Sequence, residues 1–169
     1  MKQIEEIYNK FNKQIFRYFY HLTYDPDLAG ELTQETFYQV IISIHRFKGN
    51  SKLSTWIYSI ARNTYLKKIK KESKYLPTEE KDLHNLIPPD STNNPEVLLE
   101  QHEQKDKIKR VFSELSENYA SILILRDKNG LSYKEISEIT GMSDSSVKVT
   151  LFRARQKFKE IYSNYEGGE

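Results

Sequence analysis

Apolar residues recur every three or four positions along most of this 169-residue chain, and nowhere do they alternate with polar residues as in a strand. From Ile4 to Leu22 they form one continuous helical stripe. Asp25-Pro26 is a helix start signal, since Asp can cap the first turn and Pro fits within it. A second stripe runs from there to about Arg46. The spacing predicts an all-α protein.

The regular spacing is lost between Glu72 and Asn94, where acidic residues and several prolines replace the apolar stripe. A Pro-rich, acidic segment cannot bury enough apolar surface to fold alone. Helical spacing returns after Pro95 and continues into the last part of the chain. We therefore expect two small helical modules, residues 1–75 and 96–165, joined by a flexible acidic linker over residues 76–95.

The net charge is only +2, but the basic residues are unevenly placed, which indicates local basic faces. The absence of cysteine excludes disulfides, thiolate catalysis and cysteine-based zinc sites. The N-terminus, MKQIEEIYNKFNKQIF, has acidic residues where a signal peptide needs an apolar run. No stretch approaches the ~18 apolar residues of a membrane span. We expect a cytoplasmic protein with no direct membrane insertion.

Residues 131–155, LSYKEISEITGMSDSSVKVTLFRAR, form two amphipathic segments joined by a short turn. Ser132 and Glu135 fit a capping box, and Gly141 permits the turn. This is the pattern of a helix-turn-helix, whose second helix enters the DNA major groove. A plain helical hairpin with a solvated basic face is the alternative. The residues expected to bind DNA are Ser143, Ser145, Ser146, Lys148, Val149, Phe152, Arg153 and Arg155.

Three further motifs lie in the N-terminal module: L-x-Q-E-x-F at Leu32 to Phe37, F-x-G at Phe47 to Gly49, and T-W-x-x-x-I-A-R-N at Thr55 to Asn63. They resemble region 2 of the extracytoplasmic-function (ECF) sigma factors, and the helix-turn-helix resembles region 4 of the same family. Together the two resemblances cover nearly the whole chain. They imply a bacterial transcription initiation subunit that binds core RNA polymerase and promoter DNA, with an anti-sigma factor as a further partner.

The resemblance also implies which residues form the binding sites. Core polymerase would be bound by Glu31, Leu32, Gln34, Glu35 and Phe37, and the promoter −35 element by the helix-turn-helix residues named above. The −10 element would be bound by Lys48, Gly49, Asn50, Ser51, Lys52, Asn63, Lys67 and Lys70. Gly, Asn and Ser in that loop offer hydrogen bonds with little bulk, as a pocket for a flipped base requires.

The chain departs from the family pattern at two places. Lys67 and Lys70 stand where many members have Asp and Arg, which puts the fine contacts to single-stranded DNA in question. Lys148-Val149-Thr150 replaces a more usual Lys-Ser-Arg, which predicts an unusual preference for the upstream promoter element. Trp56 shares its spacing with Ile57 and Ile60, so we expect it in the core rather than stacked on a base.

Two other classes of function are the alternatives. An autonomous repressor or activator explains the helix-turn-helix but leaves the motifs between Leu32 and Asn63 without a role. An enzyme is disfavoured, because the four histidines show no metal-ligand spacing and no nucleophile or phosphate loop is present. No metal, no cofactor and no catalytic residue is expected.

Overall fold

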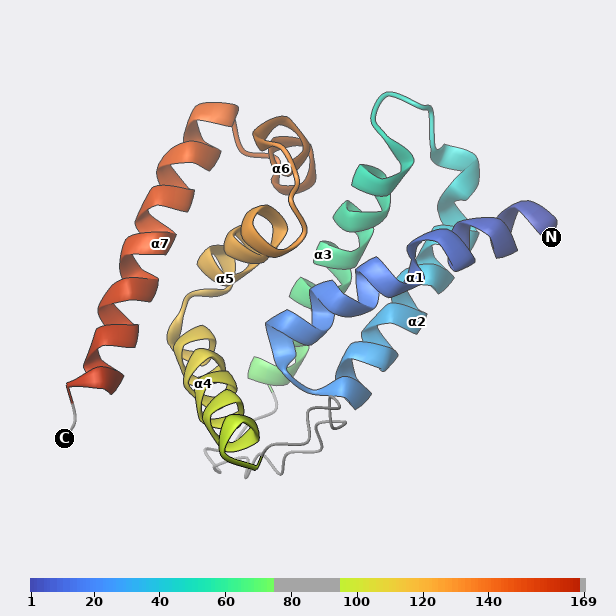
Figure 1. Cartoon of the computed structure of the whole chain (residues 1–169). Coiled ribbons are helices and arrows are strands. Elements are labelled where there is room, and N and C mark those ends of the chain that lie inside the picture. Colours follow the sequence, from blue (N-terminus) through green and yellow to red (C-terminus); the bar gives the residue numbers. More distant parts are fainter. Residues whose placement is uncertain (75–94, 168–169) are drawn as a thin grey trace.

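The computed structural model describes residues 1–74 and 95–167, and within these ranges the chain forms helices and no strand. The all-α prediction is therefore confirmed, as is the division into two helical modules (Figure 1). The predicted linker, residues 76–95, lies outside the described residues except for Pro95, which begins a helix.

The N-terminal module consists of α1 (Lys2–Thr23), α2 (Pro26–Ser43), the short 3-10 helix η1 (Ile44–Arg46) and α3 (Leu53–Ser73). Tyr24 adopts a left-handed conformation (φ 51°) that ends α1, and the Asp25 side chain then accepts hydrogen bonds from the Asp27 and Leu28 amides at 3.0 and 3.1 Å. The side chains of Ile15, Phe19 and Ile57 are almost completely buried in the core of this module.

The C-terminal module consists of α4 (Pro95–Glu114), α5 (Glu117–Leu123), the π-helical segment η2 (Ile124–Lys128), α6 (Tyr133–Thr140) and α7 (Asp144–Glu166). The predicted capping box begins α6, with Ser132 and Glu135 satisfying each other's backbone amides. Gly141 ends α6 with φ 74°, a conformation that favours glycine. This turn directs α7 across α5 and α6, which completes the helix-turn-helix.

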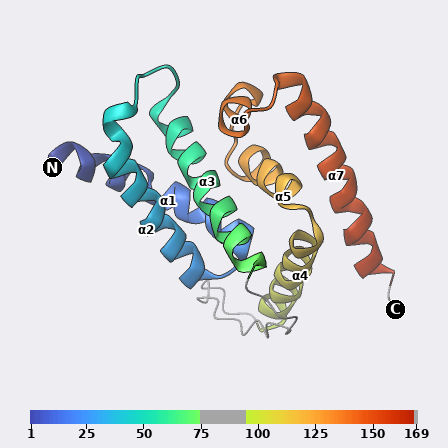
Figure 2. The ribbon, with the colours of Figure 1, turned by 180° about the vertical axis from the view of Figure 1, so that it is seen from behind.

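The two modules pack directly against each other, with α3 beside α6 and α1 beside η2 (Figures 1 and 2). Tyr18 of α1 is fully buried there and shares a 2.8 Å hydrogen bond with Ser121 of α5. The Asn129 side-chain amide donates to the Tyr58 hydroxyl at 2.8 Å, and the rings of Tyr24 and Phe112 lie 6.2 Å apart. We call these contacts the module interface.

Candidate functional site

The residues expected to bind core polymerase divide into a buried pair and an exposed row on α2. Leu32 and Phe37 are 2% and 4% exposed, and the rings of Phe37 and Tyr8 pack in a T-shaped arrangement with their centres 4.9 Å apart. Glu31, Gln34 and Glu35 face solvent. The buried pair therefore fixes the position of α2, and the exposed row is the surface that a partner would contact. We call Glu31, Gln34 and Glu35 the α2 surface.

A groove between α2 and α3 runs beside the α2 surface. Lys68 of α3 pairs with Glu31 at 3.1 Å, while the Gln39 amide donates to Glu35 at 2.8 Å. Lys67, expected to bind the −10 element, lines the same groove. Lys67 is thus placed next to the α2 surface, whereas Lys70 is exposed further along α3.

The loop expected to bind the −10 element joins η1 to α3. Lys48, Gly49, Asn50 and Lys52 are exposed and Ser51 is half-buried, so the loop presents backbone and short polar side chains to solvent. Gly49 adopts φ 74°, which a residue with a side chain rarely does. At the base of the loop Trp56 lies 5.3 Å from Phe47 and packs on the core, as its spacing predicted. Asn63 is exposed on α3.

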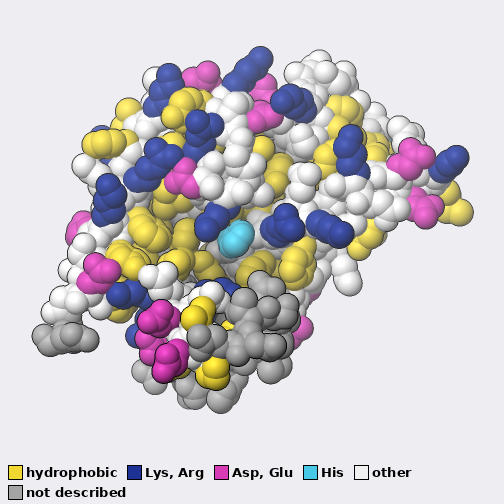
Figure 3. All heavy atoms as spheres, viewed as in Figure 1, with side chains coloured by type: hydrophobic (Ala, Val, Ile, Leu, Met, Phe, Trp, Pro, Cys, Tyr) yellow, Lys and Arg dark blue, Asp and Glu magenta, His cyan; other side chains and the backbone are white. Residues whose placement is uncertain are grey.

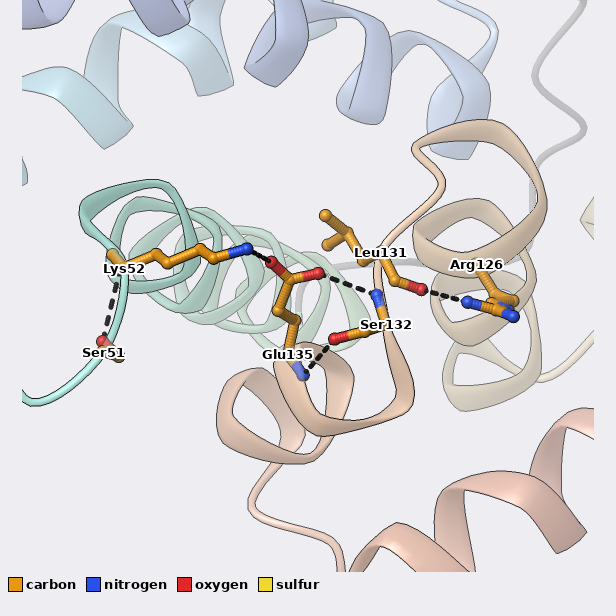
Figure 4. Close-up of polar contacts among 6 residues, drawn as sticks. All are labelled: Ser51, Lys52, Arg126, Leu131, Ser132 and Glu135. Atoms are coloured by element: carbon orange, nitrogen blue, oxygen red, sulfur yellow. Dashed lines mark hydrogen bonds and ion pairs between the residues drawn. The ribbon is translucent and has the colours of Figure 1, made fainter.

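One loop residue contacts the other module. The Lys52 ammonium lies 2.9 Å from a Glu135 carboxylate oxygen, and the other oxygen of Glu135 accepts from the Ser132 amide (Figure 4). These hydrogen bonds, that from Lys52 first, lower the pKa of Glu135. A side chain expected to contact the −10 element is therefore bound to the first helix of the helix-turn-helix.

On α7 the predicted DNA-binding side chains lie on the side facing away from the core. Val147, Leu151 and Ala154 point inward and are buried. The opposite side carries the exposed residues Ser145, Ser146, Lys148, Val149, Phe152, Arg153 and Arg155. Ser143 caps the helix by accepting a hydrogen bond from the Ser146 amide at 3.2 Å. The structure thus brings the whole predicted set together along one helix.

The basic residues of this set differ in how they are held. Arg155 makes a two-point ion pair with Asp127 of η2, at 2.6 and 3.2 Å. Lys148 places its ammonium 5.4 Å from the centre of the Tyr133 ring. Arg153 makes no ion pair with any residue in the described part of the chain. In Figure 3 Lys and Arg side chains are spread over α7 and the middle of the face, and acidic side chains gather near the start of α4.

Comparison with known families identifies both modules. The family model described as sigma-70 region 2 matches residues 7–75, and that described as sigma-70 region 4 matches residues 105–158. The ECF RNA polymerase sigma factor SigM of Bacillus subtilis is 34% identical over 160 residues, 95% of each chain. The RNA polymerase sigma factor YlaC of the same organism is 32% identical over 157 residues, 93% of this chain and 90% of YlaC. This chain belongs to the ECF RNA polymerase sigma factors.

Two solved structures share the fold. RpoE of Bartonella quintana, solved with the anti-sigma factor NepR, superposes with a TM-score of 0.72 at 21% identity, over 96% of this chain and 98% of RpoE. CnrH, solved with the cytosolic domain of CnrY, gives a TM-score of 0.70 at 12% identity, over 96% of this chain and 89% of CnrH.

As an ECF sigma factor, the chain acts in promoter-directed initiation of transcription, which confirms the function predicted from the sequence. Sigma factors are transcription initiation factors. Within residues 1–74 and 95–167 no group of three His, Asp or Glu side chains is placed to hold a metal ion. None of the helices described is both long and apolar enough to span a membrane.

Two exposed apolar residues of this sigma factor adjoin the α2 surface and were missed from the sequence. Tyr38 and Ile42 are 58% and 49% exposed and follow Gln34 at successive intervals of four residues, so they continue the same side of α2. The signal was present in the spacing. The L-x-Q-E-x-F motif ends at Phe37 and so does not include them. Continuing the helical spacing from Gln34 for two turns identifies both Tyr38 and Ile42.

Proposed function

We propose that the three surfaces described above have separate binding roles in the initiation of transcription. The α2 surface binds core RNA polymerase, the loop from Lys48 to Lys52 with Asn63 binds the −10 element, and the exposed side of α7 binds the −35 element. The observation that supports this proposal most is the α2 surface, a row of exposed polar residues above the buried pair Leu32 and Phe37. A repressor that binds DNA alone would not need such a surface. The proposed module boundaries are residues 1–75 and 96–165, joined by residues 76–95.

Initiation requires the two modules to separate. By their names the −10 and −35 elements lie about 25 base pairs apart, on the order of 85 Å at ~3.4 Å per base pair. We call the arrangement in which the module interface is formed the closed chain, and the loop from Lys48 to Lys52 the −10 loop. In the closed chain the −10 loop contacts α6 through Lys52, and the loop and the start of α7 lie at the same end of the molecule (Figures 1 and 2). Breaking the module interface therefore precedes simultaneous contact with both elements.

An anti-sigma factor that stabilises the closed arrangement would keep the protein inactive. The sigma factor RpoE, which shares this fold, was solved in complex with the anti-sigma factor NepR, and this supports the assignment. Because a partner bound across the closed modules would cover the α2 surface or prevent opening, it should compete with core polymerase. We place these events in the cytoplasm.

Co-purification with core polymerase followed by run-off transcription tests the proposal. The chain should form a stoichiometric complex with core and produce promoter-specific transcripts. Glu35→Lys reverses charge at an exposed position of the α2 surface and should weaken the complex without unfolding the protein. Glu103→Lys makes the same change on exposed α4 and serves as the matched control. Equal core affinity of Glu35→Lys and the parent would show that the docking surface is wrongly assigned.

A further inference from the structure

Two large apolar side chains face solvent on the DNA-facing side of α7. Val149 is 48% and Phe152 62% exposed, while their neighbours Val147 and Leu151 fill the core. The two exposed residues stand three positions apart, so they lie on the same side of the helix. The core does not account for their apolar character, which points to a partner that offers apolar groups at this site.

The charges around the pair identify the class of partner. Lys148 and Arg153 adjoin Val149 and Phe152 in sequence and are exposed, and Arg155 follows. Two short polar residues, Ser145 and Ser146, precede them at the start of the helix. A basic border around an apolar pair, on the second helix of a helix-turn-helix, matches duplex DNA rather than an apolar protein surface.

Within the major groove only one base presents an apolar group. Thymine carries a C5-methyl there, whereas the other groups along the groove are hydrogen-bond donors and acceptors. At ~1.5 Å per residue, Val149 and Phe152 are separated by about 4.5 Å along the axis of α7. On zinc-finger helices in the major groove, residues three positions apart contact successive bases. Each side chain can therefore meet a different, neighbouring base pair.

We propose that Val149 and Phe152 recognise the C5-methyl groups of thymines at neighbouring base pairs of the −35 element. The inference rests on the proposed function of α7 and adds the chemical class of its target. Lys148 and Arg153 bind the flanking phosphates and supply affinity, and the apolar pair supplies selectivity for thymine over cytosine. The preferred −35 element then contains thymine on one or the other strand at these two positions.

The test uses the holoenzyme reconstituted from core polymerase and the full chain. A pool of duplex promoters, randomised over the −35 segment, is transcribed and the productive sequences are recovered. Thymines enriched at neighbouring positions are then replaced one at a time by deoxyuridine, which keeps the base pair and removes only the methyl group. Each replacement should reduce transcription about fourfold, the equivalent of about 0.8 kcal/mol for one buried methyl-sized group.

The variant Val149→Ala/Phe152→Ala separates methyl recognition from general DNA binding. It should transcribe thymine and deoxyuridine templates equally, because it lacks the side chains that detect the methyl. Leu99→Ala removes a 59% exposed apolar residue from α4 and should keep the full difference between the two templates. The inference would be overturned if the unmodified chain transcribed deoxyuridine templates as actively as thymine templates. It would also be overturned if deoxyuridine reduced transcription by the double variant as much as by the unmodified chain. Failure of every template would instead refute the proposed function.

Discussion

Tyr18 and Ser121 lie 103 positions apart in the sequence, and their hydroxyl groups share a 2.8 Å hydrogen bond that is closed off from solvent. Burial raises the pKa of Tyr18, and the rings of Tyr18 and Tyr58 pack in a T-shaped arrangement with their centres 5.8 Å apart. A buried hydroxyl without a partner is costly, so this bond ties the stability of the module interface to two residues. It also fixes α1 against α5 in the closed arrangement.

Replacing Tyr18 by Phe should destabilise the chain by about 1 to 3 kcal/mol, since Ser121 keeps a buried hydroxyl with no partner. Chemical denaturation followed by circular dichroism measures the change. Tyr18→Phe combined with Ser121→Ala should cost less than the sum of the two single changes, because the orphaned hydroxyl is then gone. Additive losses would mean that the two hydroxyls do not interact in solution.

Two glycines provide a matched pair for the turn of the helix-turn-helix. Gly141 has φ 74° and Gly30 lies within α2, and a methyl group added at either would meet no atom within 4 Å. Gly141→Ala should therefore cost roughly 1 to 2 kcal/mol from backbone strain alone. Gly30→Ala should instead stabilise by about 0.5 to 1 kcal/mol, because alanine favours a helix. Thermal denaturation of the two variants should shift in opposite directions, and shifts of the same sign would contradict this account of the turn.

His21 should make the stability depend on pH just below 6.5, the ordinary pKa of a histidine. Burial lowers its pKa below 6.5, and the positive charges of Lys128 on η2 and Arg17 on α1 lower it further. Between the lowered pKa and 6.5 the unfolded chain binds more protons than the folded chain. Stability should be complete above pH 6.5 and should decline as the pH falls through 6.5 toward the lowered value.

Denaturation midpoints between pH 5 and 7.5 measure this dependence. His21→Gln should flatten the curve in that window, whereas His45→Gln, at an exposed position of η1, should leave the slope of the parent. A parent curve that is already flat would show that burial and the charges of Lys128 and Arg17 do not act on His21 in solution.

Local rules predicted several helix ends, although α2 stops at Ser43 and the residues up to Arg46 form the 3-10 helix η1 instead of continuing it. The cap at Asp25, the capping box at Ser132 and the turn at Gly141 each depend on neighbouring residues, and the structure has all three where the sequence placed them. The family motifs likewise identified both modules. Leu32 and Phe37 show the limit of a motif, because it does not separate residues that support a surface from residues that form it.

The packing of the modules could not be predicted in the same way. Tyr58, Ser121 and Asn129 have no local sequence pattern that predicts a partner. Each makes its contact with a residue on the other side of the predicted linker in the sequence. Lys52 and Glu135 already had expected roles, in the −10 loop and the capping box. Their ion pair depends on tertiary geometry that one sequence does not encode in its spacing.

The central claim is that a chain closed through the module interface opens when it joins core polymerase. Because the protein has no cysteine, the exposed changes Lys13→Cys and Lys134→Cys allow one fluorescent label on α1 and one on α6. Energy transfer between the labels should be high in the free chain and low once core polymerase and promoter DNA are added. Transfer that stays as high in a transcribing holoenzyme as in the free chain would contradict the claim.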